Sequence, residues 1–227
     1  MRPLAQRHPV DPRDEGELVL RLAAGDESAC EALYLAYRAP LWRFAYGYVR
    51  SREVAEELVQ EVFLSLWRSR TDAGLRTCIR AWLYAAVRNH ALNHLRHERV
   101  VTRLSERSGR AHSMHGGFEP ALVGDAIAMG EQEPDAQLTV EAHELDAAVA
   151  RAVRALPERR RLAMTLRWKH DLSPLEIARV LDTTPESVRV LLTRARQELA
   201  TLLGLARPVA TSARRSTGPS QEDSLSV

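Results

Sequence analysis

The sequence predicts an all-α protein with two helical domains joined by a flexible linker, the C-terminal domain being a helix-turn-helix. Apolar residues recur at helical spacing in both halves of the chain, and no segment shows the alternation of a β-strand. The stretch between the halves is rich in glycine and polar residues, as linkers are. The expected parts are a disordered leader (1–14), a first domain (15–104), the linker (105–138), a second domain (139–204) and a disordered tail (205–227).

Capping residues predict where the helices of the first domain begin. Asp26 and Ser51 carry side-chain oxygens that can accept the free N–H groups of a first helical turn. Pro40 suits the first position of a helix, where no N–H is needed. The expected elements are helices at 26–38, from Pro40 onward and at 51–68, a loop from Ser69 to Leu75, and a fourth helix at 77–99.

The C-terminal part carries two helix-start signals close together, after helical periodicity returns at residue 140 and a helix begins near 156–158. In the capping box Ser173-Pro174-Leu175-Glu176, Ser173 and Glu176 can each accept the backbone N–H of the other. Thr184-Pro185-Glu186 repeats the signal, and Asp182 and Thr183 form the turn between. This arrangement predicts a helix-turn-helix, which places its second helix in the DNA major groove.

The second helix of this unit has an apolar side and a polar side. Its apolar stripe consists of Val188, Leu192, Ala195 and Leu199. Its other faces carry arginines, which can neutralise phosphates, and polar side chains, which can read base edges. An ordinary solvated amphipathic helix would show the same pattern, so the helix alone leaves both interpretations open.

Charge is unevenly distributed, although the chain carries a net charge of only +2. Four glutamates at 53–61 make an acidic face, whereas the helix at 77–99 is strongly basic. Neighbouring segments of opposite charge suggest two different partners. Cys30 and Cys78 have no CxxC neighbour, which argues against a zinc or redox motif. The absence of a signal-peptide core and of a long apolar run leads us to expect a soluble, cytoplasmic protein without membrane insertion.

The acidic helix, Ala55 to Trp67, should bury one side and expose the other. The expected core residues are Ala55, Leu58, Val59, Val62 and Leu66, and the expected outward residues are Glu57, Gln60, Glu61 and Leu64. A leucine among acids on an exposed face is a plausible protein contact. A solvated acidic face is equally compatible with this periodicity.

The basic helix places Ile79, Leu83, Val87, Ala91 and Leu95 on its core side. Its other positions hold residues that suit nucleic acid: Arg80, Tyr84, Arg88, Asn89, Asn93 and Arg96. Arginine can hold phosphates, asparagine can pair with adenine, and aromatic rings can stack on an unpaired base. Trp82 and Tyr84 could also be core aromatics, and for Trp82 we favour the core.

Three histidines of this helix, His90, His94 and His97, lie close together at helical spacing. They lack the glutamate of an HExxH motif and a convincing fourth ligand, so phosphate contact is the better interpretation. We therefore expect no metal, no cofactor and no catalytic residue.

Four segments together resemble the sigma-70 family of sigma factors, specifically the extracytoplasmic-function (ECF) group. These segments are Glu31 to Tyr37, Ala55 to Trp67, Ala81-Trp82-Leu83-Tyr84 followed by Arg88-Asn89 and Arg96, and Leu156-Pro157 through Arg194-Ala195-Arg196. The resemblance covers about 17–99 and 145–203. It implies a non-enzymatic factor that binds core RNA polymerase and recognises and melts promoter DNA.

The resemblance also implies roles for the residues. The face formed by Glu57, Gln60, Glu61 and Leu64 would bind a basic coiled coil of the polymerase clamp, and the second domain would meet the flap. The loop Ser69 to Leu75 and the helix after it would hold the −10 element, with Arg80, Tyr84, Arg88, Asn89, Asn93 and Arg96 as contacts. The −35 element would be read by Ser187, Arg189, Val190, Thr193, Arg194, Arg196 and Gln197. An anti-sigma factor is a possible further partner.

The sequence departs from the family pattern at a few positions. Val190-Leu191 stands where the family usually has a small polar residue and a base-contacting arginine, Cys30 replaces a phenylalanine, and Asn93 replaces an aspartate. Val190 could meet a thymine methyl, or the helix reads its promoter weakly.

The main alternative function is that of a stand-alone helix-turn-helix regulator, but the N-terminal half lacks the strand-helix alternation of a receiver domain. A metal-dependent enzyme lacks a convergent set of carboxylates.

Overall fold

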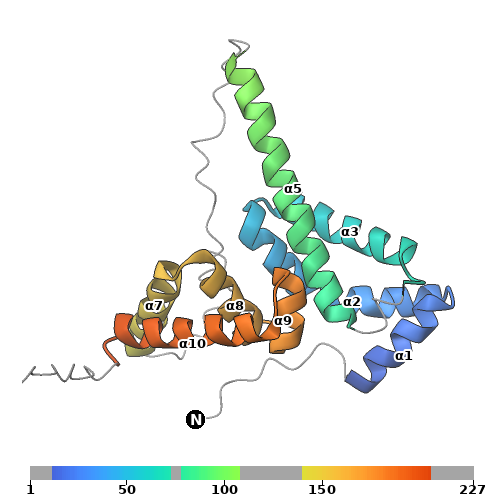
Figure 1. Ribbon diagram of the computed structural model, residues 1–227. Helices are drawn as coiled ribbons and strands as arrows, with labels where there is room; N and C mark the ends of the chain where they lie inside the picture. Colours follow the sequence, from blue (N-terminus) through green and yellow to red (C-terminus); the bar gives the residue numbers. More distant parts are fainter. Residues whose placement is uncertain (1–11, 73–77, 108–139, 206–227) are drawn as a thin grey trace, which may run out of the picture.

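The computed structural model describes residues 12–72, 78–107 and 140–205, and every regular element in these ranges is an α-helix (Figure 1). The first domain contains α1 (Pro12–Ala23), α2 (Glu27–Val49), α3 (Arg52–Arg68) and α5 (Ile79–Arg107); the second contains α7 (Val140–Ala155), α8 (Glu158–Trp168), α9 (Pro174–Leu181) and α10 (Pro185–Leu202). The all-α prediction is confirmed for these residues. Most of the expected leader, linker and tail lies outside them.

Helix α2 corrects one expectation, because it runs without a break through Pro40. A proline inside a helix removes one hydrogen bond and crowds the preceding turn, at about 3 kcal/mol. Tyr37, Leu41 and Phe44 are buried on both sides of Pro40, and α2 packs against both α3 and α5. This burial offsets the cost of the proline, so two expected helices form one. The cap at Asp26 is confirmed, since its side chain accepts the N–H of Ser28.

Helix α5 is longer than expected, since it begins at Ile79 and continues to Arg107 instead of ending near residue 99. Its predicted core side is confirmed: Ile79, Leu83, Val87, Ala91 and Leu95 are all buried. From Arg96 to Arg103 every residue is exposed, and Figure 1 shows this end of α5 projecting beyond the other helices. The extension therefore depends on helical propensity rather than on packing within the described part of the chain.

The second domain forms the predicted helix-turn-helix from α9 and α10. The reciprocal hydrogen bonds of the capping box are present, with Ser173 Oγ 3.2 Å from the Glu176 N and Glu176 Oε2 2.7 Å from the Ser173 N. Asp182 turns the chain with a φ of 50°, and Thr184 caps α10 by accepting the N–H of Ser187. The predicted stripe of Val188, Leu192, Ala195 and Leu199 is buried.

A test of this cap is Ser173→Ala. The substitution removes the acceptor for the Glu176 N–H, and losing such a cap typically lowers the free energy of unfolding by about 1 kcal/mol. Thermal unfolding should show the loss, whereas Ser173→Thr should retain most of the stability. Equal stability of the alanine variant and the parent would contradict this role for the cap.

Candidate polymerase and nucleic-acid interfaces

The outer face of α3 is acidic, with one large apolar residue. Glu57, Gln60 and Glu61 are exposed, and Leu64 is 56% exposed. The predicted inner side is confirmed, and Phe63 is buried with it against the edge of the Tyr34 ring. Ser51 caps the helix as predicted. This face is thus rigidly presented by a helix whose other side belongs to the core.

A cleft of about 270 Å³ lies where α3 meets α5, and it brings the acidic face together with the three histidines. It is lined by Val54, Glu57, Leu58, Glu61, His90, Asn93, His94 and His97. His90 Nδ1 is 3.1 Å from Glu61 Oε2. Among the described residues no three potential ligands are placed to bind a metal ion. His90 is a hydrogen-bond partner of the acidic face, a role that the sequence did not indicate.

An apolar groove of about 540 Å³ continues from the α3 face onto α2. Its lining residues are Glu27, Cys30, Glu31, Tyr34, Gln60, Phe63, Leu64 and Trp67. Gln60 and Leu64 belong to both the groove and the outer face of α3. A protein partner that docks on α3 can therefore insert apolar side chains beside its contacts with the acids.

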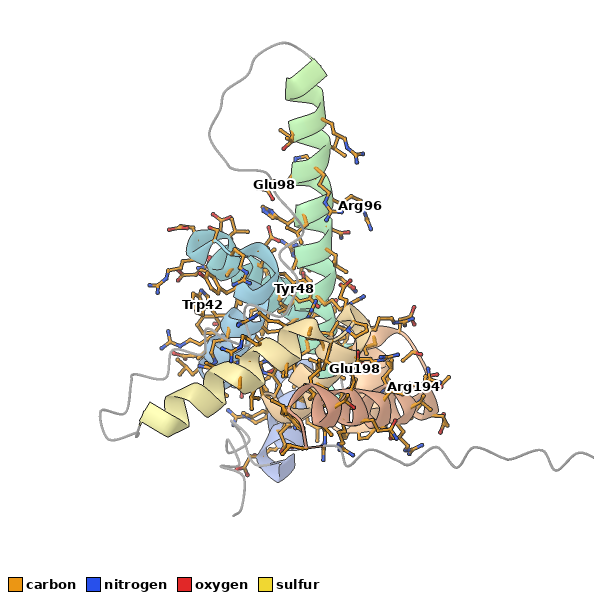
Figure 2. All side chains as sticks on the ribbon, turned by 90° about the vertical axis from the view of Figure 1, so that its left-hand side faces the viewer. Trp42, Tyr48, Arg96, Glu98, Arg194 and Glu198 are labelled. Atoms are coloured by element: carbon orange, nitrogen blue, oxygen red, sulfur yellow. The ribbon has the colours of Figure 1, made fainter. Side chains whose placement is uncertain are left out.

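The proposed −10 residues of α5 fall into two groups. Asn89, Asn93 and Arg96 are exposed, and Arg96 donates a hydrogen bond to Asn93 Oδ1 (Figure 2 marks Arg96 on the projecting part of α5). Arg88 is partly buried. Arg80 and Tyr84 are instead buried, at 7% and 2% exposure. The expected loop before α5 is described only up to Asp72.

The second domain is what covers Arg80 and Tyr84. Arg80 Nη2 donates to the backbone carbonyl of His170 over 2.7 Å, and the Tyr84 hydroxyl lies 2.8 Å from His170 Nδ1. Arg80 Nε is 3.8 Å from a carboxylate oxygen of Glu176. The His170 ring also meets the edge of Phe44, with centroids 5.5 Å apart. The sequence indicated none of these contacts, since Glu176 fits a capping box and His170 belongs to no motif. Trp82 is partly buried against the core.

The exposed side of α10 carries the complete expected −35 set. Ser187, Arg189, Val190, Thr193, Arg194, Arg196 and Gln197 are all exposed. Arg189 pairs with Glu186 at 3.0 Å, and Thr193 Oγ1 donates to the backbone carbonyl of Arg189. Val190 is 49% exposed, whereas Leu191 packs against the core. Figure 2 shows Arg194 on α10.

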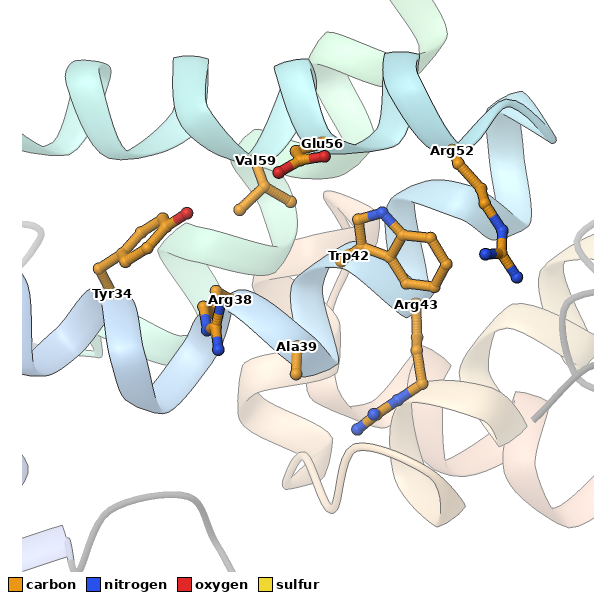
Figure 3. Close-up of a pocket in the computed structure, with 8 residues that line it drawn as sticks. All are labelled: Tyr34, Arg38, Ala39, Trp42, Arg43, Arg52, Glu56 and Val59. Carbon is orange, nitrogen blue, oxygen red and sulfur yellow. The ribbon is translucent and has the colours of Figure 1, made fainter. Parts of the chain in front are cut away.

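A basic cleft between α2 and α3 was not predicted (Figure 3). It measures about 510 Å³ and is lined by Tyr34, Arg38, Ala39, Trp42, Arg43, Arg52, Glu56 and Val59. Trp42 stacks on Tyr46 with ring centroids 5.2 Å apart. Three arginines beside an aromatic ring suit phosphate and base contacts. The cleft was not predicted because two helices separated at Pro40 were expected, which placed Arg38 and Trp42 on different elements.

Comparison with known proteins bears on both domains. The family described as Sigma-70 region 2 matches residues 33–100, and the family described as Sigma-70, region 4 matches residues 146–199. The first match covers most of α2, all of α3 and most of α5. The second covers α8, α9 and most of α7 and α10.

Individual relatives agree with these matches. The chain is 28% identical to the RNA polymerase sigma-H factor of Pseudomonas aeruginosa, over 81% of this chain and 90% of that protein. It is 29% identical to the ECF RNA polymerase sigma-E factor of Escherichia coli K12, over 80% and 90%. It is also 29% identical to the ECF RNA polymerase sigma factor BldN of Streptomyces coelicolor, over 82% of this chain and 65% of that protein.

A solved structure shows the same fold. CnrH, determined in complex with the cytosolic domain of CnrY, superposes with a TM-score of 0.53 and 19% identity, covering 85% of this chain and 99% of CnrH. In the described ranges no helix is both long enough and apolar enough to cross a membrane. With family matches in both domains, the chain belongs to the sigma-70 family of RNA polymerase sigma factors, in its extracytoplasmic-function group.

Proposed function

We propose that this sigma factor binds its partners through three surfaces. The acidic face of α3, formed by Glu57, Gln60, Glu61 and Leu64, docks on a basic coiled coil of the polymerase clamp. Helix α5 holds the −10 element through Arg80, Tyr84, Arg88, Asn89, Asn93 and Arg96. Helix α10 reads the −35 element, and its domain also meets the polymerase flap.

One observation carries this proposal: the exposed faces of α3 and α10 have opposite chemistry. The α3 face offers carboxylates around a solvated leucine, which suits a basic protein surface. The α10 face offers three arginines with hydroxyl and amide groups between them, which suits a phosphate backbone and base edges. A regulator that acted through DNA alone would have no use for the first face.

We include the basic cleft beside Trp42 as an additional surface for the melted strand. Arg43 at the edge of this cleft acts electrostatically on both Tyr84 and His170, so it is close to the N-terminal end of α5. A strand held by α5 could thus continue toward the cleft over basic side chains. Stacking of one base on such a ring typically contributes about 1–3 kcal/mol.

We propose no catalytic step for the chain itself. The polymerase performs catalysis, and the sigma factor works in the cytoplasm with it. We also propose an anti-sigma partner, as the family resemblance implies. The apolar groove next to the α3 face is the natural place for such a protein to compete with polymerase.

The experiment that tests the proposal is run-off transcription with purified core polymerase and a library of genomic promoter fragments. We expect specific transcripts only when both the chain and the core enzyme are present. A chain that shifts duplex DNA unaided but does not co-elute with core polymerase would instead be a stand-alone regulator.

Arg189→Ala tests the −35 surface. Removing a bidentate contact with a base should cost about 1–3 kcal/mol of binding free energy. Footprinting of the holoenzyme on a promoter found by run-off transcription should show weaker protection of the upstream element. Arg159→Ala is the matched control, because it removes an exposed arginine from α8. Unchanged protection in the Arg189 variant would show that Arg189 does not contact the −35 element.

A further inference from the structure

The basic cleft between α2 and α3 has the composition of a small-ligand site. We propose that it binds one unpaired nucleotide, with the base stacked on Trp42 and the phosphate held among Arg38, Arg43 and Arg52. This names the ligand of a surface that the function proposed above gives to the melted strand, and it rests on that function only where the nucleotide is part of a strand.

Trp42 has one face of its ring available to a ligand. Its indole is half-buried and stacks on the Tyr46 ring, with centroids 5.2 Å apart and an angle of 11° between the ring planes. Within the described ranges no guanidinium lies over the Trp42 ring, whereas Arg70 lies over the Trp67 ring, 4.7 Å from its centroid. Because Tyr46 covers one face, only the other face can receive a base. The cleft therefore suits a single base rather than a continuous stack.

The arginines of the cleft surround this ring. Figure 3 shows Arg38 and Arg52 on opposite sides of the indole and Arg43 below it. Arg38 and Arg43 form no ion pair or side-chain hydrogen bond with any described residue, whereas Arg21 and Arg160 each pair with a carboxylate. A guanidinium without a carboxylate partner remains available to a phosphate, which it can bind through two parallel hydrogen bonds.

The charge and the size of the cleft both fit a nucleotide. Its three arginines and Glu56 give the lining a net charge of +2. A phosphate monoester carries about −1.5 to −2 at pH 7, and the two phosphates that flank a nucleotide in a strand carry about −2 together. The volume of about 510 Å³ lies within the range of about 300–1,000 Å³ that is typical of small-ligand pockets. A free nucleotide and a nucleotide of a single strand therefore share the chemistry that the cleft recognises.

Glu56 should give the cleft a preference among bases. Its exposed carboxylate forms no ion pair with any described residue, and Figure 3 shows it on the wall of the cleft above Val59. An ionised carboxylate only accepts hydrogen bonds, so it favours the two adjacent N–H donors of guanine over the single donor of uracil, which is flanked by carbonyls. Guanosine monophosphate should bind more tightly than uridine monophosphate, and Glu56→Gln should reduce the difference. Equal affinities in the parent chain would contradict this role for Glu56.

Binding can be measured on the full chain by NMR of the tryptophan indole N–H groups, with guanosine 5′-monophosphate as the probe. The chain has four tryptophans, and loss of one signal in Trp42→Phe identifies Trp42. We expect the probe to shift this signal saturably and to leave the signal of Trp168, which is 55% exposed in the second domain, unchanged. Inorganic phosphate should shift the Trp42 signal much less, because it has no base. A Trp42 signal that ignores the nucleotide, or that responds equally to phosphate, would overturn the proposal.

Two kinds of substitution separate stacking from charge, with calorimetric titration as the measurement. Trp42→Leu should weaken nucleotide binding at least about fivefold, the lower end of what one stacked base contributes, whereas Trp42→Phe should retain most of the affinity. Arg38→Gln with Arg43→Gln should weaken binding at least about tenfold, since two charged donors are lost. Arg151→Gln with Arg159→Gln is the matched control, because it removes the same charge from exposed positions of the second domain.

Circular dichroism shows whether each variant keeps its helices. The arginine pair keeps the test decisive if the leucine variant unfolds, because both arginines are exposed. Parental affinity in the folded leucine variant would contradict stacking on Trp42. An equal loss in the cleft pair and in the control pair would mean that the nucleotide responds to overall charge and not to the cleft.

A single-stranded DNA tetranucleotide with one guanine distinguishes the two sources of the nucleotide. If the cleft serves the melted strand, the tetranucleotide should shift the Trp42 signal at lower concentration than the mononucleotide, and open complexes of the Trp42→Leu holoenzyme should decay faster in permanganate footprinting. If the cleft takes a free nucleotide, the mononucleotide should bind more tightly and open complexes should decay at the parental rate. Failure of run-off transcription by the parent chain would reject the proposed function, while the NMR titration of the free chain would still decide whether the cleft binds a nucleotide.

Discussion

Replacing Glu57, Gln60 and Glu61 together by arginine is expected to abolish the binding of this chain to core polymerase. The change converts a local charge of −2 into +3, so attraction to a basic coiled coil becomes repulsion, which costs several kcal/mol where like charges meet at an interface. All three side chains are exposed, so the helices should remain intact. Co-elution with core polymerase measures binding, and circular dichroism verifies the fold. Each single replacement is also expected to abolish transcription.

A matched control separates this effect from a general change of charge. Asp14→Arg with Glu17→Arg reverses two exposed acids of α1, away from the α3 face. This control chain should co-elute with polymerase as the parent does. Normal co-elution of the triple variant would mean that another surface binds polymerase.

Leu192→Ala is expected to destabilise the second domain by about 2–5 kcal/mol, the usual range for truncating a buried leucine. Leu192 is only 5% exposed and belongs to the stripe that fastens α10 to α8 and α9. Calorimetry should show a lower melting temperature, and protection of the −35 element should be lost as the helix loses its support.

Val190→Ala is the informative companion, because Val190 lies two residues away on the same helix but is 49% exposed. Its removal should leave the melting temperature nearly unchanged. If Val190 meets a thymine methyl, only protection of the −35 element will weaken. A large loss of stability in the Val190 variant, or none in the Leu192 variant, would contradict the burial pattern of α10.

Local signals in the sequence predicted local structure well. The caps at Asp26, Ser51 and Ser173 are present, and the apolar stripes of α3, α5 and α10 are buried, because each depends on residues within a few turns of one another. The failure at Pro40 has a tertiary cause. The intrinsic preference of proline to begin a helix was overridden by burial of apolar residues on both sides of it.

The contact between the domains could not be predicted from the same signals. Arg80, Tyr84 and His170 are each ordinary in their own segments, and no periodicity links residues that are about ninety positions apart. The family resemblance indicated where DNA should bind but gave no sign that Arg80 and Tyr84 contact the second domain. Long-range pairing of this kind becomes visible only when both helices are placed in space.

If the α3 face docks on polymerase and α5 binds DNA, as we propose, the hydrogen bond between His90 and Glu61 links the two binding events thermodynamically. Glu61 belongs to α3 and His90 to α5, so a cation of the clamp that bound the carboxylate would remove it from the imidazole. The released ring is then free to turn toward a phosphate. By reciprocity, a phosphate that bound the imidazole would leave Glu61 available to the clamp, so each partner would make binding of the other more favourable.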